Sequence, residues 1–320
     1  MTGANRLSGP LAASHPAAPG MVTVRRRRLQ EVMGRDWALG YLLLLPAIAV
    51  LVGLIAYPFL YSIFLSLQNK PIAEPGTFVG FKNYLTLWRS SVFLLVIRNT
   101  LIVMIVGVGL KFLAGLMLAL ILHERIRFRE LWRALLFVPW TIPIVVSGFS
   151  WRWILDDMNG VLNMLLNQLG IIDHYITWLG DPQLAIWMVV AAVLWEGTPF
   201  YTMNFLAGLA AIPGELYEAA RIDGASAVQC FFHITLPGLK NVIIITTLLS
   251  AIWTATELQW VFVLTKGGPG HASETFPMMA YLQAIGAKAL GMGAAVALSF
   301  FPLFLIIIFF LTRRLLRSEE

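Results

Sequence analysis

Six long apolar stretches constrain this chain of 320 residues more than any other feature of its sequence. A helix needs about 20 predominantly apolar residues to cross the hydrocarbon core of a bilayer. Several stretches contain proline, which a helix in a bundle tolerates because neighbouring helices satisfy the freed backbone groups. The predicted fold class is an all-α polytopic membrane protein with six transmembrane helices, at residues 38–61, 96–121, 133–155, 184–209, 242–265 and 289–312.

The composition supports this interpretation. Apolar residues make up 58% of the chain and charged residues 12%, whereas a soluble domain carries about 25% charged residues. This excess argues against an ordinary soluble enzyme, a coiled coil and a disordered chain. Cys230 is the sole cysteine, so no intrachain disulfide can form and a disulfide scaffold is excluded.

The distribution of Lys and Arg predicts the orientation, because cytoplasmic loops carry an excess of these residues. With the N-terminus inside, the inner segments hold 15 of them and the outer segments 5. Both termini are therefore predicted to be cytoplasmic. The predicted domains are a disordered basic tail at 1–36, a six-helix transmembrane domain at 37–314 and a cytoplasmic tail at 315–320.

The outer loop at 156–183 contains no Lys or Arg. Leucines at 162, 165, 166 and 169 recur at helical spacing. We expect a short helix there, lying on the outer surface.

The segment at 210–240, between the fourth and fifth spans, is too polar to cross the membrane. Acidic residues favour the first turn of a helix, Asp-Gly marks a turn, and Ser followed three residues later by Gln forms a capping box. These signals predict two short cytoplasmic helices joined at a glycine: a helix over 215–222, a turn at Asp223 and Gly224, and a helix that begins at Ser226 and ends at Leu236 and Pro237. Taken alone, the segment also fits an amphipathic surface connector.

The spacing of this segment resembles the E-A-A-x-x-x-G loop, followed by I-x-L-P, of binding-protein-dependent ABC importer permeases. The matching residues are Glu218, Ala219, Ala220 and Gly224, then Ile234, Thr235, Leu236 and Pro237. Asp223-Gly224-Ala225 fits the sugar-importer branch, and two further pieces agree: Trp195-x-Gly197-x-Pro199 and Thr265-x-Gly267-Gly268-Pro269. The resemblance covers residues 38–314 and is closest to the F-type subunit of maltose-like transporters.

The resemblance implies a type I ABC importer permease in a bacterial inner membrane. It implies pairing with a G-type permease, two cytosolic ATPase subunits and an extracytoplasmic sugar-binding protein. The chain would not be an enzyme: ATP and Mg would bind the partner ATPase, and the chain has no G-x-x-x-x-G-K-[ST] motif. No cofactor is expected on this chain. The expected ATPase-coupling residues are Glu218, Ala219, Ala220, Asp223 and Gly224.

Glu196 and Glu257 are the acidic residues inside the predicted spans. A charge at the centre of a spanning helix costs about 2.5–3.5 kcal/mol on insertion scales, so such residues usually face protein or water. Carboxylates accept hydrogen bonds from sugar hydroxyls, and aromatic rings cover the C–H face of a pyranose. Both acids lie beside aromatic residues, so the two segments carry the chemistry of a sugar site.

Aligned on the two further motifs, the resemblance assigns the substrate pocket to the fourth and fifth spans. The acids at 196 and 257 depart from the maltose pattern, so the identity of the sugar is not carried over. Packing against a partner subunit is the alternative role for both acids. The expected residues are Ser250, Trp253, Thr254, Glu257, Glu196, Gly197 and Phe200, with Tyr201 and Asn204 near them.

Other residues and functions are weighed against this hypothesis. Trp260 is interpreted as a packing residue, and Lys111 is expected to pair with an acid or line an interface. The cargo would be an oligosaccharide, monosaccharide or polyol; a phosphorylated polyol would need a cation, which only Lys111 is deep enough to supply.

The main alternative function is a stand-alone ion-coupled secondary transporter that uses Glu196 and Glu257. It predicts paired broken helices in an internal repeat, which the sequence does not display. A membrane enzyme or assembly scaffold is a third hypothesis. The five histidines have no metal-site spacing, and Ser147 and Ser150 have no evident His partner, so no catalytic or metal-binding residues are assigned.

Overall fold

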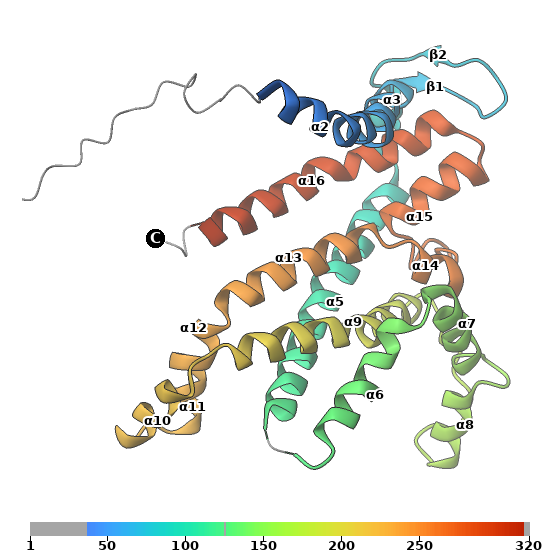
Figure 1. Ribbon diagram of the computed structural model, residues 1–320. Coiled ribbons are helices and arrows are strands. Elements are labelled where there is room, and N and C mark those ends of the chain that lie inside the picture. The colour runs from blue at the N-terminus through green and yellow to red at the C-terminus, as the bar shows by residue number, and fades with distance from the viewer. Residues whose placement is uncertain (1–36, 125, 317–320) are drawn as a thin grey trace, which may run out of the picture. The chain divides into compact units, whose positions relative to one another are not determined.

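The computed structural model describes residues 37–124 and 126–316, and these residues are mostly helical (Figure 1). The predicted tail at 1–36, with its four arginines at 25–28, lies outside the described residues, as do Arg125 and residues 317–320. The chain divides into two structural units, residues 1–57 and 58–320. In the first unit, α2 (Trp37–Leu51) is followed by a π-helical turn at Val52–Ala56.

Helix α3 (Tyr57–Ser66) begins at the last residue of the first unit, and the second unit continues with a small β-hairpin. Strands β1 (Gln68–Asn69) and β2 (Thr77–Phe78) pair antiparallel, with Gln68 opposite Phe78. Eleven longer α-helices follow among the described residues of this unit. They are α4 (Lys82–Trp88), α5 (Ser91–His123), α6 (Arg129–Thr141), α7 (Ile144–Ile154), α8 (Val161–Gln168), α9 (Ala185–Ala210), α10 (Gly214–Ile222), α13 (Lys240–Thr256), α14 (Gln259–Leu264), α15 (Phe276–Tyr281) and α16 (Leu290–Leu316). Two shorter helices, α11 (Ala227–Cys230) and α12 (Leu236–Gly238), lie in the loop between α9 and α13, and π-helical turns lie at Phe231–Thr235 and Leu282–Gly286.

Within the described ranges, three segments are apolar and long enough to cross a bilayer: Tyr41–Ser66, Ser91–His123 and Lys240–Leu264. The pair α6 and α7 makes a fourth if it is counted as one span. Helices α9 and α16 have 26 and 27 residues, which at 1.5 Å per residue is about 39 Å. The hydrocarbon core is about 30 Å thick, so both have the length of a span, although neither is among the apolar segments named above. The predicted six spans depend on counting these two.

Two predicted spans are interrupted. The third was expected as one span over 133–155, but α6 and α7 meet at an angle of 95°. Pro143 lies at this break and, having no backbone N–H, cannot continue the hydrogen-bonding ladder of α6. The fifth span is interrupted at Glu257, whose backbone is extended (φ −74°, ψ 121°), so this residue lies at a break between α13 and α14 rather than inside a continuous helix.

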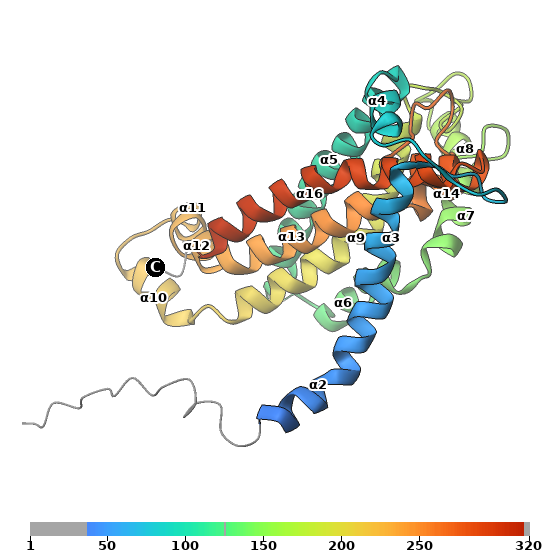
Figure 2. The same cartoon turned by 90° about the horizontal axis from the view of Figure 1, so that it is seen from above.

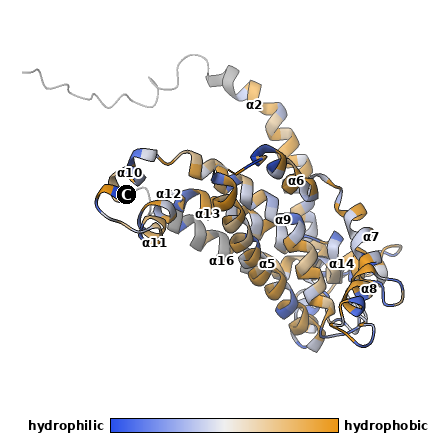
Figure 3. Ribbon diagram, turned by 90° about the horizontal axis from the view of Figure 1, so that it is seen from below, coloured by the Kyte–Doolittle hydropathy of each residue, from blue (hydrophilic) through white to orange (hydrophobic). Residues whose placement is uncertain are grey.

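Helices α9, α13 and α16 run alongside one another in two perpendicular views (Figures 1 and 2). Coloured by hydropathy, α5 and α13 are largely apolar, and hydrophilic residues gather at α10 and in the loops near α8 (Figure 3). A membrane bundle needs this distribution, because its middle faces lipid and its ends face water.

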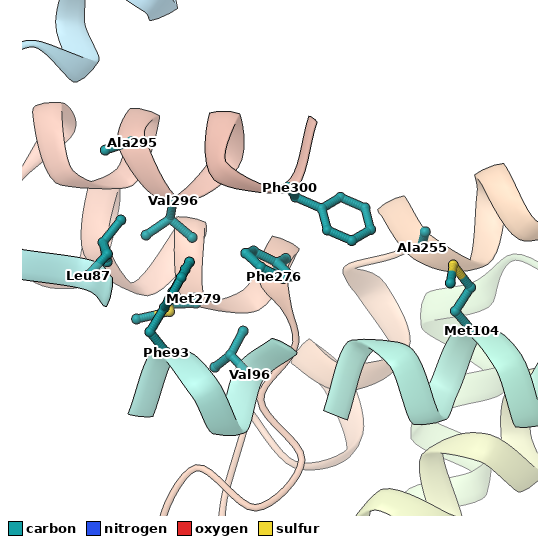
Figure 4. Close-up of a cluster of buried hydrophobic side chains, with 10 residues drawn as sticks. All are labelled: Leu87, Phe93, Val96, Met104, Ala255, Phe276, Met279, Ala295, Val296 and Phe300. Atoms are coloured by element: carbon teal, nitrogen blue, oxygen red, sulfur yellow. The ribbon is translucent and has the colours of Figure 1, made fainter. Parts of the chain in front are cut away.

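Three clusters of buried apolar side chains hold the second unit together. In the cluster of Figure 4, α5 contributes Phe93, α15 contributes Phe276 and α16 contributes Phe300. The rings of Phe93 and Phe276 pack edge to face with centroids 5.5 Å apart, a preferred aromatic geometry. The other two clusters join α9 to α14 and to α5 and α13.

Helices α5 and α9 approach each other closely at Gly115. A Cβ at this position would overlap the Cβ of Tyr201. Because glycine carries no side chain, the two backbones come near enough for Phe112 to pack edge to face against Phe205. This contact holds α5 against α9 within the helical interface that also contains Lys111.

The predicted outer helix is α8, Val161–Gln168. Asn163 on this helix is fully buried and organises the segment that follows. Its Oδ1 accepts hydrogen bonds from the backbone N–H of Ile176 (3.1 Å) and from Trp178 Nε1 (2.9 Å), and its Nδ2 donates to the carbonyl of Ile176 (2.9 Å). One amide thus ties α8 to the chain 13–15 residues further on.

Candidate functional site

A cavity of about 240 Å³ lies among α5, α6, α7, α9, α13 and α14. Three charged side chains and several aromatic ones line it. The lining residues are Lys111, Trp140, Ile144, Val193, Glu196, Gly197, Phe200, Ser250, Trp253, Thr254, Glu257 and Trp260.

The structure brings seven of the predicted substrate residues to this one cavity: Glu196, Gly197, Phe200, Ser250, Trp253, Thr254 and Glu257. Asn204 is not among the lining residues; its Nδ2 donates to the carbonyl of Phe200 (2.7 Å). Tyr201 is fully buried and packs in the cluster shared by α5 and α9 instead. Trp260 is buried in a packing cluster, as the sequence predicted, and also lines the cavity.

Lys111 is the cation of the cavity. Its side chain is buried, and its Nζ donates a 2.7 Å hydrogen bond to Oγ1 of Thr254. The Thr254 hydroxyl can accept this bond because its own proton goes to the carbonyl of Ser250 (2.7 Å). The sequence suggested that Lys111 pairs with an acid or lines an interface. Within the described ranges no carboxylate oxygen lies within 4.0 Å of Nζ, and the side chain lies between α5 and α9, against Gly197.

Gly197 provides the space for this lysine. A Cβ at Gly197 would overlap Cδ of Lys111 and lie 3.2 Å from its Nζ. The glycine of the Trp-x-Gly-x-Pro motif therefore lets a long cationic side chain lie across α9.

The two acids line the cavity together with Lys111 and come from separate parts of the chain. Glu196 is half-buried on α9. Glu257 is half-buried at the break between α13 and α14, where one carboxylate oxygen accepts from the backbone N–H of Gln259 (2.6 Å). The backbone at the break satisfies part of this carboxylate, whose remaining lone pairs can accept from a ligand in the cavity.

Aromatic rings form one wall. Phe200 packs edge to face against Trp253 with centroids 4.9 Å apart, and it stacks on Trp140 at 6.4 Å. Sequence reasoning missed Trp140, which lies on α6, as well as Ile144 and Val193. A bend of 95° after α6 is not evident from composition, so no local signal placed Trp140 at the cavity.

The coupling loop has the predicted form of two helices joined at a glycine. Helix α10 ends at Ile222, and Gly224 follows with φ +82°. Backbone bonds from Ala225 N to Ala220 O (2.8 Å) and from Gly224 N to Arg221 O (3.1 Å) form a Schellman motif. The predicted capping box of Ser226 and Gln229 opens α11, Ala227–Cys230.

The second helix ends one residue beyond the predicted Leu236 and Pro237. It continues through a π-helical turn at Phe231–Thr235 into α12, Leu236–Gly238, and Leu239 then separates α12 from α13. Pro237 lies in the first turn of α12, where a missing N–H is harmless.

The loop is exposed, and one hydrogen bond holds its two arms together. Helix α10 has no buried residue, and Leu216 and Ile222 are exposed apolar side chains. Of the predicted coupling residues, Glu218, Ala219, Asp223 and Gly224 are exposed and Ala220 is half-buried. The Tyr217 hydroxyl lies 2.9 Å from Oγ1 of Thr235, which joins α10 to the helical run that leads into α13.

An apolar helical bundle with a charged, aromatic cavity in its interior defines a membrane transport protein. The chain belongs to the binding-protein-dependent transport system inner membrane components, whose family model matches residues 111–317. The trehalose/maltose transport system permease protein MalF of Thermococcus litoralis is 37% identical over 272 residues, which cover 85% of this chain and 91% of that protein.

Two further relatives have similar coverage. The diacetylchitobiose uptake system permease protein DasB of Streptomyces coelicolor is 32% identical over 88% of this chain and 87% of its own length. The sulfoquinovosyl glycerol transport system permease protein SmoG of Agrobacterium fabrum is 32% identical over 84% of this chain and 87% of its own length.

The fold is also that of a solved transporter. A chain of a bacterial ABC transporter involved in the import of the acidic polysaccharide alginate superposes with a TM-score of 0.77 at 23% identity, covering 92% of this chain and all of that one. The predicted fold class, an ABC importer permease, is confirmed.

Proposed function

We propose that this chain is the F-type permease subunit of an ATP-driven importer that moves a sugar, delivered by a soluble binding protein, into the cytoplasm. The observation that carries the proposal is the cavity between α9 and α13, with Glu196, Glu257 and the Phe200–Trp253 ring pair on its lining. Carboxylates accept from sugar hydroxyls and the rings cover an apolar sugar face. The cavity combines the apolar lining and the few polar groups of a small-molecule site.

Sugar permeases among the relatives support this cargo. The name of MalF of Thermococcus litoralis gives trehalose/maltose as its cargo, and the name of DasB of Streptomyces coelicolor gives diacetylchitobiose. An oligosaccharide, a monosaccharide or a polyol remains our proposal for this chain. A cavity of about 240 Å³ is just below the usual range for ligand pockets, about 300–1,000 Å³. We expect a second, G-type permease to complete it.

Coupling to ATP would take place at α10. Its exposed Leu216 and Ile222 and the small Ala219 offer a surface that a cytosolic ATPase subunit can cover. ATP and Mg would bind that partner and not this chain. When two ATPase subunits close on ATP, α10 would move as a lever. The Tyr217–Thr235 hydrogen bond and the helical segment at 227–238, which leads into α13, would transmit its displacement.

The proposed orientation has both termini in the cytoplasm of a bacterial cell with the chain in its inner membrane. In this orientation α10 faces the cytoplasm and α8 faces outward. The excess of Lys and Arg in the inner segments supports this arrangement.

The test is purification of the tagged chain in mild detergent from native membranes, with the co-purifying proteins identified. We expect a second six-span permease and a nucleotide-binding ATPase, and ATP hydrolysis by the complex should rise when the sugar-loaded binding protein is added. Recovery of the chain alone, as a stable monomer or homodimer, would contradict the proposal and favour an ion-coupled carrier.

A further inference from the structure

The charges around the cavity bear on whether its cargo is uncharged or acidic. Family membership leaves this open, because one structurally similar transporter imports the acidic polysaccharide alginate. Lys111 is 4% exposed, and one of its three N–H donors is bound, to Thr254. No carboxylate of the described residues lies within 4.0 Å of it. Donors of Lys111 are therefore left for a ligand in the cavity that it lines.

Acceptors are available on the same lining. Within the described ranges, Glu196 forms no hydrogen bond or ion pair, and Glu257 accepts from the backbone N–H of Gln259 and keeps further lone pairs. The Nε1–H of Trp260 is buried and has no partner among the described residues. A bound sugar can accept from the ammonium through its oxygens and donate from its hydroxyls to both carboxylates.

An acidic cargo would meet a cavity lining with more negative than positive groups. With one ammonium and two carboxylates, the lining has a net formal charge of −1. The carboxylate of an acidic sugar would approach one cation and two anions, and charges interact strongly where water is scarce. An uncharged sugar uses all three groups without this repulsion.

We propose that Lys111 is a substrate-binding and specificity-determining residue, and that the cavity selects an uncharged sugar unit, which Lys111 holds as hydrogen-bond donor and Glu196 and Glu257 hold as acceptors. The proposal rests on the function proposed above, sugar import. It assigns to α5 a part of the site whose expected residues the sequence placed on the fourth and fifth spans.

The experiment measures ATP-driven uptake into proteoliposomes that hold the complete importer with its binding protein. Labelled maltose, trehalose and diacetylchitobiose are the uncharged probes, and labelled glucuronate is the acidic probe. Because the binding protein is the same throughout, the ratio of variant to wild type for each probe reports on the cavity.

Lys111→Met is expected to raise KM for the uncharged probe at least about tenfold with a smaller change in maximal rate, since a hydrogen bond to a charged group is lost. Glu196→Gln is expected to raise uptake of glucuronate relative to the uncharged probe by about tenfold. Lys82→Met, which removes an exposed lysine on α4, is the matched control and should change neither value.

An unchanged KM in an assembled Lys111→Met complex overturns the assignment of Lys111, as does a wild type that prefers glucuronate. If Lys111→Met does not assemble, Glu196→Gln decides, and an unchanged probe ratio overturns the proposal. A wild-type complex that transports no sugar at all contradicts sugar import itself, which separates that failure from a wrong role for Lys111.

Discussion

Gly197 on α9 leaves the space in which the side chain of Lys111 on α5 lies, because a Cβ at Gly197 would overlap Cδ of that lysine. The glycine of the Trp-x-Gly-x-Pro motif thus shapes the cavity by making room for Lys111, which lies 86 positions earlier in the chain. It leaves the ammonium of Lys111 at 2.7 Å from Oγ1 of Thr254, in the cavity that both acids also line.

Gly197→Ala should therefore displace Lys111 and reduce transport. Overpacking of this kind costs about 1–3 kcal/mol, and we expect uptake of the sugar to fall about tenfold or more while the ATPase still co-purifies. Gly109→Ala, on α5 near Lys111, is the control, because a Cβ at Gly109 meets nothing within 4 Å. Equal uptake by the two variants would show that the space at Gly197 is unimportant.

Glu257→Gln should impair uptake and leave the complex assembled. The amide keeps an oxygen for the backbone N–H of Gln259, so the break between α13 and α14 should persist while the charge is lost. A hydrogen bond to a charged group contributes about 1.5–3 kcal/mol, which corresponds to roughly a tenfold fall in kcat/KM for uptake. Wild-type transport by this variant would remove Glu257 from the site; Glu74→Gln, in the exposed β1–β2 loop, is the control.

Gly224→Asp should uncouple or detach the ATPase without unfolding the spans. Gly224 has φ +82° and open space around it, so the cost is conformational, about 1–2 kcal/mol, with a further unfavourable charge at the end of α10. Gly224→Asn has the same size without the charge and should be impaired less. The readouts are ATPase co-purification and stimulated ATP hydrolysis. Normal values for both in Gly224→Asp would refute the lever role of the loop.

Tyr217→Phe removes the hydroxyl that bridges α10 and Thr235. One such bond contributes about 0.5–1.5 kcal/mol, so α10 should still form but transmit its movement less well. We expect sugar-stimulated ATP hydrolysis to fall about twofold to tenfold with ATPase binding retained. Tyr175→Phe, at an exposed tyrosine of the outer segment, is the control. An equal, small effect of both would mean that the bridge has no part in coupling.

Asn163→Ala should loosen the outer segment and spare the coupling loop. The substitution leaves the N–H of Ile176 and Nε1 of Trp178 without their acceptor, at a cost of about 1–3 kcal/mol for each buried group left unpaired. Proteolysis within residues 156–184 should become faster. Asn167→Ala, which removes one exposed bond to Ile172, should change little. If the Asn163→Ala variant were cleaved at the same rate as the wild type, the proposed role of this amide would be contradicted.

Local signals predicted the elements whose cause is local. The capping box of Ser226 and Gln229 and the turn at Gly224 appear where the sequence placed them, because a cap and a left-handed residue depend on neighbours three or four positions away. The predicted end at Pro237 differs from the observed end of α12 by one residue, because a proline in the first turn of a helix interrupts no hydrogen bond.

The sequence by itself determined that the chain is a helical membrane protein with a patterned loop and with acids at 196 and 257, because hydropathy and helix signals act over one or a few turns. Only the tertiary structure decided that Lys111 reaches Thr254 across 143 residues, that Trp140 joins the cavity through a 95° bend, and that Asn204 stays away from it. The physical reason is that apolar helices of similar composition can pack in many rotations and crossings. Specific contacts between distant segments, such as the space left by Gly197, select one of them.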